Sequence, residues 1–125
     1  MEENVDAVCT DLKDLFKKLL KEKRRFYGED WSDWKNKTTG GQKHPCVYLL
    51  WQKNEVNRPS YIGETVGLGR RLYKHWDEEN WSKPKWQSVQ YISDSKLDDG
   101  EFRQLFECFC IYIMNPKDND INRKK

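Results

Sequence analysis

The sequence is poor in features that mark several large classes of protein. It has four cysteines, four prolines and seven glycines among 125 residues, and the cysteines form no C-x-x-C pair. We therefore expect neither a zinc site nor a disulfide framework. No apolar run is long enough for a signal peptide or a membrane span, so no membrane partner is expected. These absences predict an intracellular protein, in the cytoplasm or the nucleus, whose thiols are reduced and buried.

The net charge is also small, at +2, and by itself it does not indicate a nucleic-acid-binding protein. The distribution of charge is more informative, because basic side chains gather in two short stretches. These stretches contain Lys17, Lys18, Lys21, Lys23, Arg24 and Arg25, and then Arg70, Arg71, Lys74 and His75. Acidic residues concentrate elsewhere, between Asp94 and Glu101. Solvated helix faces explain such a pattern, and so does a basic surface that contacts DNA.

The chain length allows one compact domain. Residues 1–44 are expected to form an amphipathic helix and an aromatic loop, which pack on a core of residues 45–125. The helical stripe of apolar residues runs from Val5 to Leu20 and has a polar opposite face. A helix of this kind normally covers its own core, but it could also pair two copies of the chain in a homodimer or lay its basic end on DNA.

Three short segments are expected to form strands. Cys46 to Gln52 and Ser60 to Gly63 are separated by turn residues, which predicts a β-hairpin, and Trp86 to Ile92 is the third segment. Gly67 is expected to open a helix between the second and third strands. This order predicts an α+β fold with a small three-stranded antiparallel sheet flanked by helices and an extra N-terminal amphipathic helix.

The last helix has clear start and stop signals. Asp98 is expected as its N-cap, with Glu101 at the third helical position. The helix should stop by Asn115, because Pro116 disfavours helical geometry in the residue before it.

Glu107 is the first candidate for a chemical role. From Gln104 to Met114 the last helix is apolar nearly all round, so we expect it to be mostly buried, and Glu107 is its single charged residue. An unpaired carboxylate in such a place is costly. Glu107 is therefore expected either to pair with a cation or to bind a metal ion at the edge of a cleft.

Arg71 and His75 are the next candidates. They lie four residues apart on the helix that starts at Gly67, so they share one face. Free amides and the positive end of the helix dipole at this start favour an anion such as phosphate. The glycines of the turn, taken alone, equally fit a simple tight turn.

Tyr48 and Tyr61 complete the set, one on each strand of the hairpin. Strand tyrosines are usually core residues with a hydrogen-bonded hydroxyl. In chain order, however, the candidates resemble the motifs of the GIY-YIG nuclease family. The matching segments are Pro45-Cys46-Val47-Tyr48, Tyr61-Ile62-Gly63, Arg71, His75, Glu107 and Asn122. The family's spacing selects Arg71 over Arg70, and the resemblance spans most of the chain, from Pro45 to Asn122.

The chain departs from the family pattern at one position. Cys46 stands where the first motif has a glycine, and a small residue is expected to be tolerated at this backbone position. The side chains with chemical roles are all retained.

The resemblance implies a divalent-metal-dependent endonuclease that hydrolyses phosphodiester bonds in DNA. Glu107 would be the only protein ligand of a Mg²⁺ (or Mn²⁺) ion, and Arg71 would stabilise the charge of the transition state. Tyr48 is expected as the base and Tyr61 as the group that orients water. His75 would share protons with a tyrosine or the phosphate, and Asn122 would hold Glu107 or the backbone in place. The expected DNA contacts are Lys21, Lys23, Arg24, Arg25, Arg70 and Lys74.

A different class competes with this interpretation. A non-catalytic nucleic-acid-binding or protein-interaction module could retain the same fold. Such a module would be expected to lose Arg71 or Glu107, and the sequence retains both. The sequence does not determine the DNA substrate, the choice between a nick and a double-strand break, the pathway, or the oligomeric state.

Overall fold

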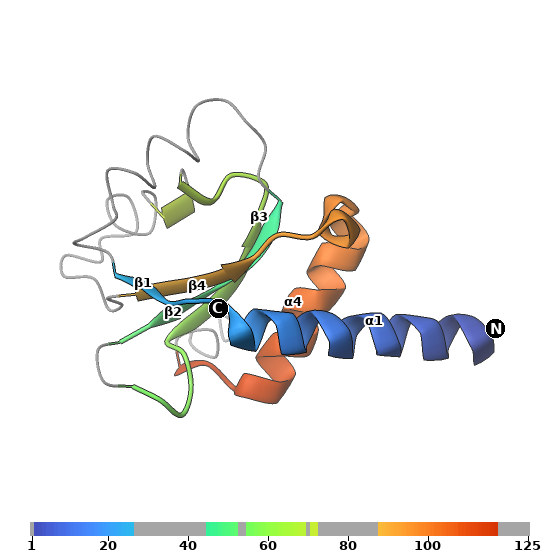
Figure 1. Cartoon of the computed structure of the whole chain (residues 1–125), viewed down its shortest axis with the longest axis horizontal. Helices are drawn as coiled ribbons and strands as arrows, with labels where there is room; N and C mark the ends of the chain where they lie inside the picture. The colour runs from blue at the N-terminus through green and yellow to red at the C-terminus, as the bar shows by residue number, and fades with distance from the viewer. Residues whose placement is uncertain (1, 27–44, 53–54, 70, 73–87, 118–125) are drawn as a thin grey trace, which may run out of the picture.

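The computed structural model describes residues 2–26, 45–52, 55–69, 71–72 and 88–117 (Figure 1). The elements of these residues, in chain order, are α1 (Glu2–Lys21), β1 (Arg25–Phe26), β2 (Cys46–Trp51), β3 (Tyr61–Thr65), β4 (Ser88–Ile92), the 3₁₀ helix η1 (Ser95–Asp98) and α4 (Gly100–Met114). Residues 68–69 and 71–72 are also helical. The predicted α+β class is confirmed, and so is the N-terminal helix.

The strands form one antiparallel sheet in the order β1-β4-β2-β3. The three predicted strands and the hairpin of β2 and β3 are present. The two-residue strand β1 adds a fourth at the edge of the sheet, and it is too short to show an alternating pattern in the sequence. Strand β2 is central, and all six of its residues are buried. Burial on both sides explains why this strand reads as a continuous apolar run.

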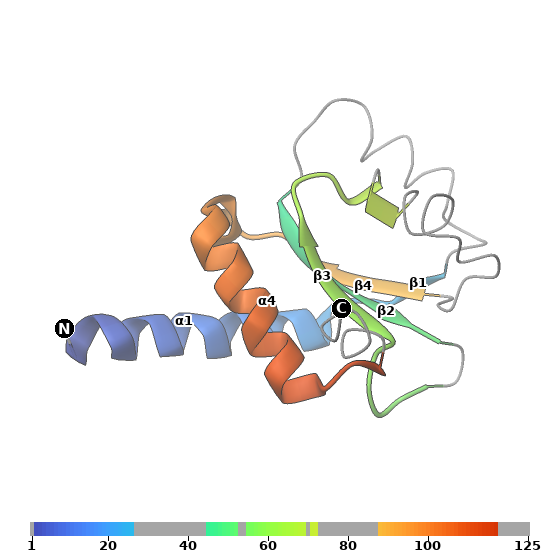
Figure 2. The same ribbon diagram turned by 180° about the vertical axis from the view of Figure 1, so that it is seen from behind.

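Side chains of β2 alternate between two separate cores, one on each side of the sheet. We call one side the helix face, because Val47, Leu49 and Trp51 pack there with residues of α1 and α4. The other side is the tyrosine face, where Tyr48 packs between Cys46 and Leu50. The remaining members of the second core are Leu68, Leu72 and Val89, with Tyr61 and Tyr91 packed against them. Figures 1 and 2 show α1 and α4 together on one side of the sheet.

Helix α1 begins near the chain start and ends at Lys21. Leu12, Leu15 and Leu19 are buried on the helix face. The N-terminal half projects beyond the sheet and α4 in both views (Figures 1 and 2). Val5 in this half is 61% exposed.

The expectation of four buried thiols is wrong for two of them. Cys46 and Cys110 are buried, whereas Cys9 and Cys108 are exposed, and all four are free. Cys9 lies on the projecting half of α1, and Cys108 lies on the side of α4 that points away from the sheet. The two cysteines of α4 therefore point in different directions, as their spacing predicts.

The start of α4 differs from the prediction by one residue. Asp99, rather than Asp98, is the N-cap, and its side chain accepts a hydrogen bond from the backbone N–H of Glu101. Asp98 is the last residue of η1. At the other end, Asn115 adopts the left-handed conformation with φ of 49° and its N–H donates to the carbonyl of Ile111, so the predicted stop is confirmed.

The expectation that α4 is mostly buried is wrong. Phe106 and Cys110 face the sheet, but Leu105 and Ile113 are about half exposed and Tyr112 is 88% exposed. Only one side of the helix meets the sheet and α1, and no described element covers the other side. In the part of the chain that the structure describes, no helix has the length and apolar character needed to cross a membrane.

Candidate active site

Tyr48 lies at the centre of the tyrosine face, directly over a glycine. Its cross-strand partner on β3 is Gly63. A Cβ atom added to Gly63 would lie 2.5 Å from the phenolic oxygen of Tyr48 and 2.6 Å from its Cζ atom. The Tyr48 ring therefore occupies the space that a side chain at this strand position would fill. The absence of a side chain at position 63 is thus what lets the phenol rest against β3.

Tyr61 lies on the same face, one diagonal step away. The rings of Tyr48 and Tyr61 have centroids 6.2 Å apart and planes tilted by 36°. Their register explains this distance, because Tyr61 pairs with Leu50, two residues beyond Tyr48 on β2. Tyr48 has no exposed surface, whereas Tyr61 is half-buried.

Arg71 connects the two tyrosines. Its guanidinium makes side-chain hydrogen bonds to Tyr48 and Tyr61, donating to their hydroxyl oxygens. The helical turn that carries Arg71 is closed by its N–H, which donates to the carbonyl of Gly67 at 3.0 Å. Leu68 precedes it in this turn and is fully buried against the tyrosine face, which fixes the position of the turn. The structure thus brings together three of the predicted site residues.

The electrostatics of this cluster fix the protonation states of Tyr48 and Arg71 at neutral pH. Burial raises the pKa of Tyr48 well above its usual range, the nearby Tyr61 adds to the rise, and Arg71 only partly opposes it. For Arg71 burial acts against the charged form, but its interactions with the two tyrosines outweigh burial and raise the pKa of the guanidinium. The guanidinium of Arg71 is therefore charged, and the Tyr48 hydroxyl beside it is neutral.

Glu107 approaches the sheet from α4, on the helix face. Its side chain is half-buried, and it lies one helical turn after the buried Arg103 and one before the buried Ile111. Burial raises the pKa of the Cys110 thiol, and the charge of Glu107 adds to that rise. Glu107 therefore belongs to the inward side of α4, not to its exposed side.

The cation nearest to Glu107 along α4 is already engaged. Arg103 Nε donates to Glu64 Oε2 of β3 at 2.6 Å, and Arg103 also donates to the Leu97 carbonyl at 2.8 Å. This pair holds α4 against β3, the strand that carries Tyr61. The pair was not predicted from the sequence, although Arg103 stands one turn before Glu107 and Glu64 directly follows the second motif. No group of three or more His, Cys, Asp and Glu side chains in the described ranges could hold a metal ion, whereas the resemblance requires a single carboxylate.

The remaining predicted site residues are only partly described. His75, Asn122, Arg70 and Lys74 lie outside the described residues, and so does the side chain of Arg25.

Lys21 and Lys23 are exposed, as a phosphate contact requires. Arg24 differs from them. Its guanidinium lies 3.5 Å from the centroid of the Trp51 ring and donates to the Glu55 carbonyl at 2.9 Å. Burial lowers the pKa of Arg24, and the charge of Glu55 opposes that change. This basic stretch follows α1 and meets Trp51 on the helix face, so the sheet lies between Arg24 and the cluster around Arg71.

No family model matches the chain, and neither does any curated protein or solved structure.

Proposed function

We propose that this chain is a divalent-metal-dependent endonuclease that hydrolyses phosphodiester bonds in DNA and acts inside the cell. The observation that carries the proposal is the contact of one guanidinium with two tyrosine hydroxyls, one of which rests on Gly63. A core needs none of these polar groups. An arginine whose charge is fixed and whose orientation is set by two hydrogen bonds is suited to a phosphate group.

Arg71 is proposed to bind the scissile phosphate and to stabilise the negative charge of the transition state. The guanidinium is half-buried and therefore interacts with an anion more strongly than it would in bulk water. Its hydrogen bonds to the tyrosines reduce the reorganisation needed when the substrate binds.

The two tyrosines are proposed to divide the remaining work. From the sequence, Tyr48 is the expected base, but its full burial and raised pKa make it a poor acceptor for a proton from water. These properties support the reverse assignment of the two tyrosines. Tyr48 orients Arg71, and the half-buried Tyr61 contacts the attacking water. His75 and Asn122 keep their proposed roles of sharing protons and holding the site in place.

Glu107 is proposed as the ligand of the metal ion. Its carboxylate oxygens match the preference of Mg²⁺ and Mn²⁺ for oxygen ligands. Glu107 is half-buried on α4, which lies on the helix face and packs against the edge strand β3, so its carboxylate would have to meet the substrate around that edge of the sheet. When bound, the ion would supply Lewis acidity at a phosphate oxygen. The side chain of Glu107 would hold its position, and the Arg103–Glu64 pair would keep α4 against β3.

The proposal is tested by incubating the purified chain with supercoiled plasmid in the presence of Mg²⁺, Mn²⁺ or EDTA. Glu107→Gln and Arg71→Lys are expected to lower the cleavage rate by a factor of about 10² to 10³, because each removes an interaction with the transition state. Glu101→Gln is a matched control, since it makes the same change at an exposed position of the same helix. Cleavage by Glu107→Gln at the wild-type rate would remove Glu107 from the site.

Single-turnover cleavage over a pH range separates the two tyrosines. Tyr61→Phe is expected to lose nearly all activity at every pH if it contacts the attacking water. Tyr48→Phe is expected to retain a measurable remainder, because Arg71 keeps its bond to Tyr61. The reverse ranking would restore Tyr48 as the base. A small loss of activity in both variants would show that neither tyrosine accepts the proton.

The proposed DNA contacts are tested by the dependence of binding on salt. Neutralising Lys21 and Lys23 should weaken binding and flatten the salt slope by about 0.9 for each phosphate that the protein no longer neutralises. Arg24→Ala is a weaker test, because it also removes the stacking of the guanidinium on Trp51. An unchanged slope would assign these lysines to a solvated surface and leave Arg70 and Lys74 as the remaining proposed DNA contacts.

The exposed apolar side of α4 favours a second candidate function. In this alternative the chain is a non-catalytic nucleic-acid-binding or protein-interaction module. Wild-type protein that cuts no plasmid with either metal ion, and whose affinity for DNA is unchanged by Arg71→Lys, would support the alternative over the nuclease.

A further inference from the structure

One edge of the apolar stripe on α1 is not covered by the chain's own core. Val5 is 61% exposed, Leu20 is 50% exposed, and Cys9 is also exposed. Phe16 is half-buried and meets Phe109 of α4 edge-on, with ring centroids 5.9 Å apart. At 100° per residue, Val5, Cys9, Phe16 and Leu20 fall within an arc of about 60°. We call these four residues the open edge of α1.

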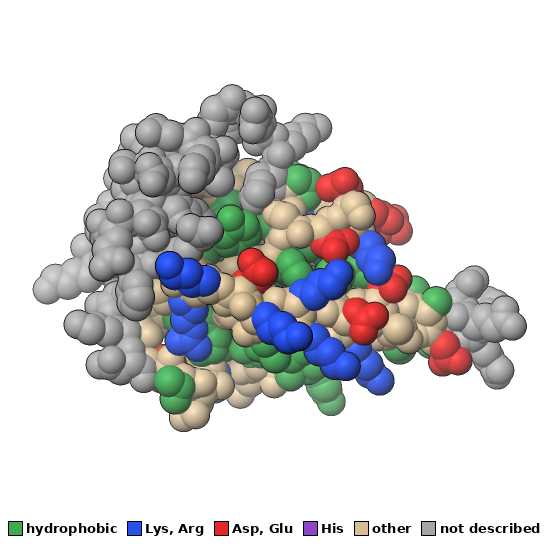
Figure 3. Space-filling view, in the orientation of Figure 1, with side chains coloured by type: hydrophobic (Ala, Val, Ile, Leu, Met, Phe, Trp, Pro, Cys, Tyr) green, Lys and Arg blue, Asp and Glu red, His purple; other side chains and the backbone are tan. Residues whose placement is uncertain are grey.

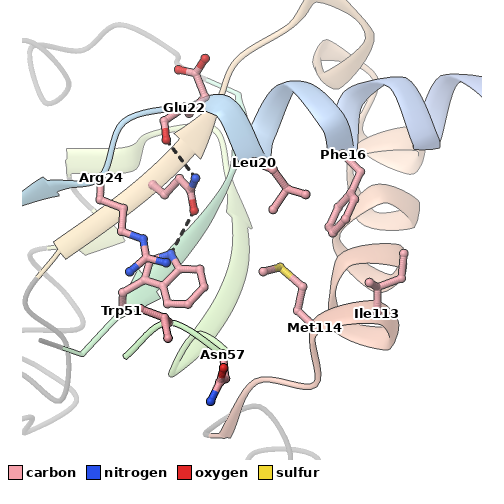
Figure 4. Close-up of a pocket in the computed structure, with 10 residues that line it drawn as sticks. Phe16, Leu20, Glu22, Arg24, Trp51, Asn57, Ile113 and Met114 are labelled. Atoms are coloured by element: carbon pink, nitrogen blue, oxygen red, sulfur yellow. Dashed lines mark hydrogen bonds between the residues drawn. The ribbon is translucent and has the colours of Figure 1, made fainter. Parts of the chain in front are cut away.

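The open edge leads into a pocket at the C-terminal end of α1. The pocket has a volume of about 510 Å³ and lies between α1, β2 and the end of α4. Phe16 and Leu20 point into it from α1, and Ile113 and Met114 point into it from α4 (Figure 4). Trp51 and the largely exposed Val56 complete the apolar lining. The exposed side chains of the open edge therefore lie beside a pocket, and an apolar side chain of another molecule can fill that pocket.

Charges beside the open edge are separated along the helix. Asp6 lies near the N-terminal end, Lys13 near the middle, and Lys17 and Lys21 near the C-terminal end, all exposed and on the same flank of α1. The opposite flank is bound within the chain, where Lys18 lies 3.7 Å from Asp94 and Asp11 lies 3.1 Å from Lys96. Figure 3 shows Lys and Arg side chains over the C-terminal half of α1, beside exposed hydrophobic side chains.

We propose that the open edge of α1 binds a second copy of this chain, with the two α1 helices antiparallel about a two-fold axis. The open edge is symmetrical in sequence about the midpoint between residues 12 and 13. Val5 and Leu20 are equally distant from this midpoint, and so are Cys9 and Phe16. An antiparallel pair centred there sets Val5 of one copy opposite Leu20 of the other, as an isologous interface requires.

The same arrangement fills the pocket and pairs the charges. In this dimer, Val5 of each copy lies at the partner's pocket, beside the partner's Leu20 and the partner's Ile113. Asp6 falls between the partner's Lys17 and the partner's Lys21, because residues on the same flank face each other in an antiparallel helix pair. In a parallel pair opposite flanks face each other, so this pairing of Asp6 with the two lysines would be absent. The apolar pattern and the pairing of Asp6 therefore favour a second copy in the antiparallel orientation, in which the two copies of Lys13 meet near the two-fold axis and oppose association.

Sedimentation velocity of the full chain over a concentration series tests the assembly. Wild-type protein is expected to sediment as a dimer. Leu20→Asp is expected to raise the dissociation constant at least about a hundredfold, because the interface would bury the new carboxylate twice. Ala7→Asp is the matched control, since it places the same charge on an exposed part of α1 away from the open edge. The circular dichroism and the urea midpoint of dilute protein check that Leu20→Asp is folded.

Charge exchange tests the orientation. Asp6→Lys should raise the dissociation constant about tenfold, because it opposes like charges at two symmetrical places, and the effect should shrink at high salt. Lys17→Asp with Lys21→Asp should do the same. A mixture of these two variants should form a heterodimer at least as tight as the wild-type dimer. An Asp6→Lys chain that dimerises as wild type does would overturn the antiparallel arrangement.

Cross-linking tests the register. In a chain with Cys9→Ser and Cys108→Ser, Lys13→Cys lies close to the two-fold axis, whereas Asp14→Cys lies about 100° further round the helix. A short bifunctional thiol reagent should link two copies through position 13 and not through position 14. Equal linking at both positions would overturn the register. A monomer at every concentration would overturn the proposal and leave the open edge to a different protein partner.

Discussion

The two faces of the sheet bury polar groups in different ways. On the helix face, Gln90 accepts a hydrogen bond from Trp51 Nε1 at 3.0 Å and donates to the carbonyls of Leu19 and Glu22 at 3.0 Å and 2.9 Å. These bonds tie the end of α1 to the sheet (Figure 4). On the tyrosine face, the polar atoms of Tyr48, Tyr61 and Arg71 are bonded to one another. The hydrogen bonds of Gln90 connect α1 to the sheet, whereas those of Arg71 bring three polar side chains together in one cluster.

This difference separates groups that hold the fold from groups that suit a ligand. The Arg103–Glu64 pair and Gln90 each join elements that are distant in sequence, so their removal should appear as a fall in stability. The hydroxyl of Tyr61 and the guanidinium of Arg71 are only half-buried and join no helix to the sheet beyond their own turn. Their removal should appear as a fall in activity under the proposed function.

The largest expected effect on stability is on the helix face. Arg103→Met leaves the largely buried carboxylate of Glu64 beside α4 without its cation, and the free energy of unfolding should fall by up to about 3 kcal/mol. Adding Glu64→Leu to the same chain should recover most of this stability, because the double change removes both charges. Urea unfolding followed by circular dichroism measures both values.

The exposed pair of Lys96 with Asp11 is the matched control for this experiment. Its length is 3.1 Å, but both side chains are well exposed. Lys96→Met should therefore cost no more than about 1 kcal/mol. Equal destabilisation for the buried and the exposed pair would show that burial does not distinguish them.

A smaller effect is expected on the tyrosine face, at the glycine beneath Tyr48. Gly63→Ala places a Cβ atom where the phenol ring now lies, and overpacking of this kind costs about 1 to 3 kcal/mol. Gly67→Ala is the control, because a Cβ at Gly67 would meet no atom within 4 Å. Tyr48→Leu should make the further change Gly63→Ala nearly neutral. Undiminished destabilisation by Gly63→Ala in the Tyr48→Leu chain would place its cause outside the tyrosine ring.

The sequence was sufficient to predict the elements and part of the site, and the limit is physical. Periodicity revealed α1, the hairpin and α4, because each buries a regular pattern of apolar residues. The start of α4 was misplaced because Asp98 and Asp99 can both cap a helix, and η1 takes up the first of them. Partners such as Arg103 with Glu64 were not predicted, since they are 39 residues apart and no local pattern joins them. The exposed side of α4 was missed because an apolar helix does not indicate how many of its sides are covered.

Alkaline pH gives the most general contrast between the faces. Burial raises the pKa of Cys46 and Tyr48 on the tyrosine face and of Cys110 on the helix face. The ordinary values are 9.0 for cysteine and 10.0 for tyrosine. In each case the unfolded chain loses the proton first, so deprotonation stabilises the unfolded state. The stability is fully present below the ordinary pKa and is lost as the pH rises above it.

The free energy of unfolding should therefore decline from about pH 9 as the cysteines titrate, by about 1.4 kcal/mol per pH unit for each group once its unfolded form is fully ionised. Above the ordinary pKa of tyrosine the decline should steepen. Cys110→Ala should reduce the slope from the lower pH onward, whereas Tyr48→Phe should remove only the steeper part. Urea unfolding at a series of alkaline pH values measures these slopes. A steeper part that survives in Tyr48→Phe would mean that another group causes it, and the tyrosine face would then contribute to alkaline unfolding only through Cys46.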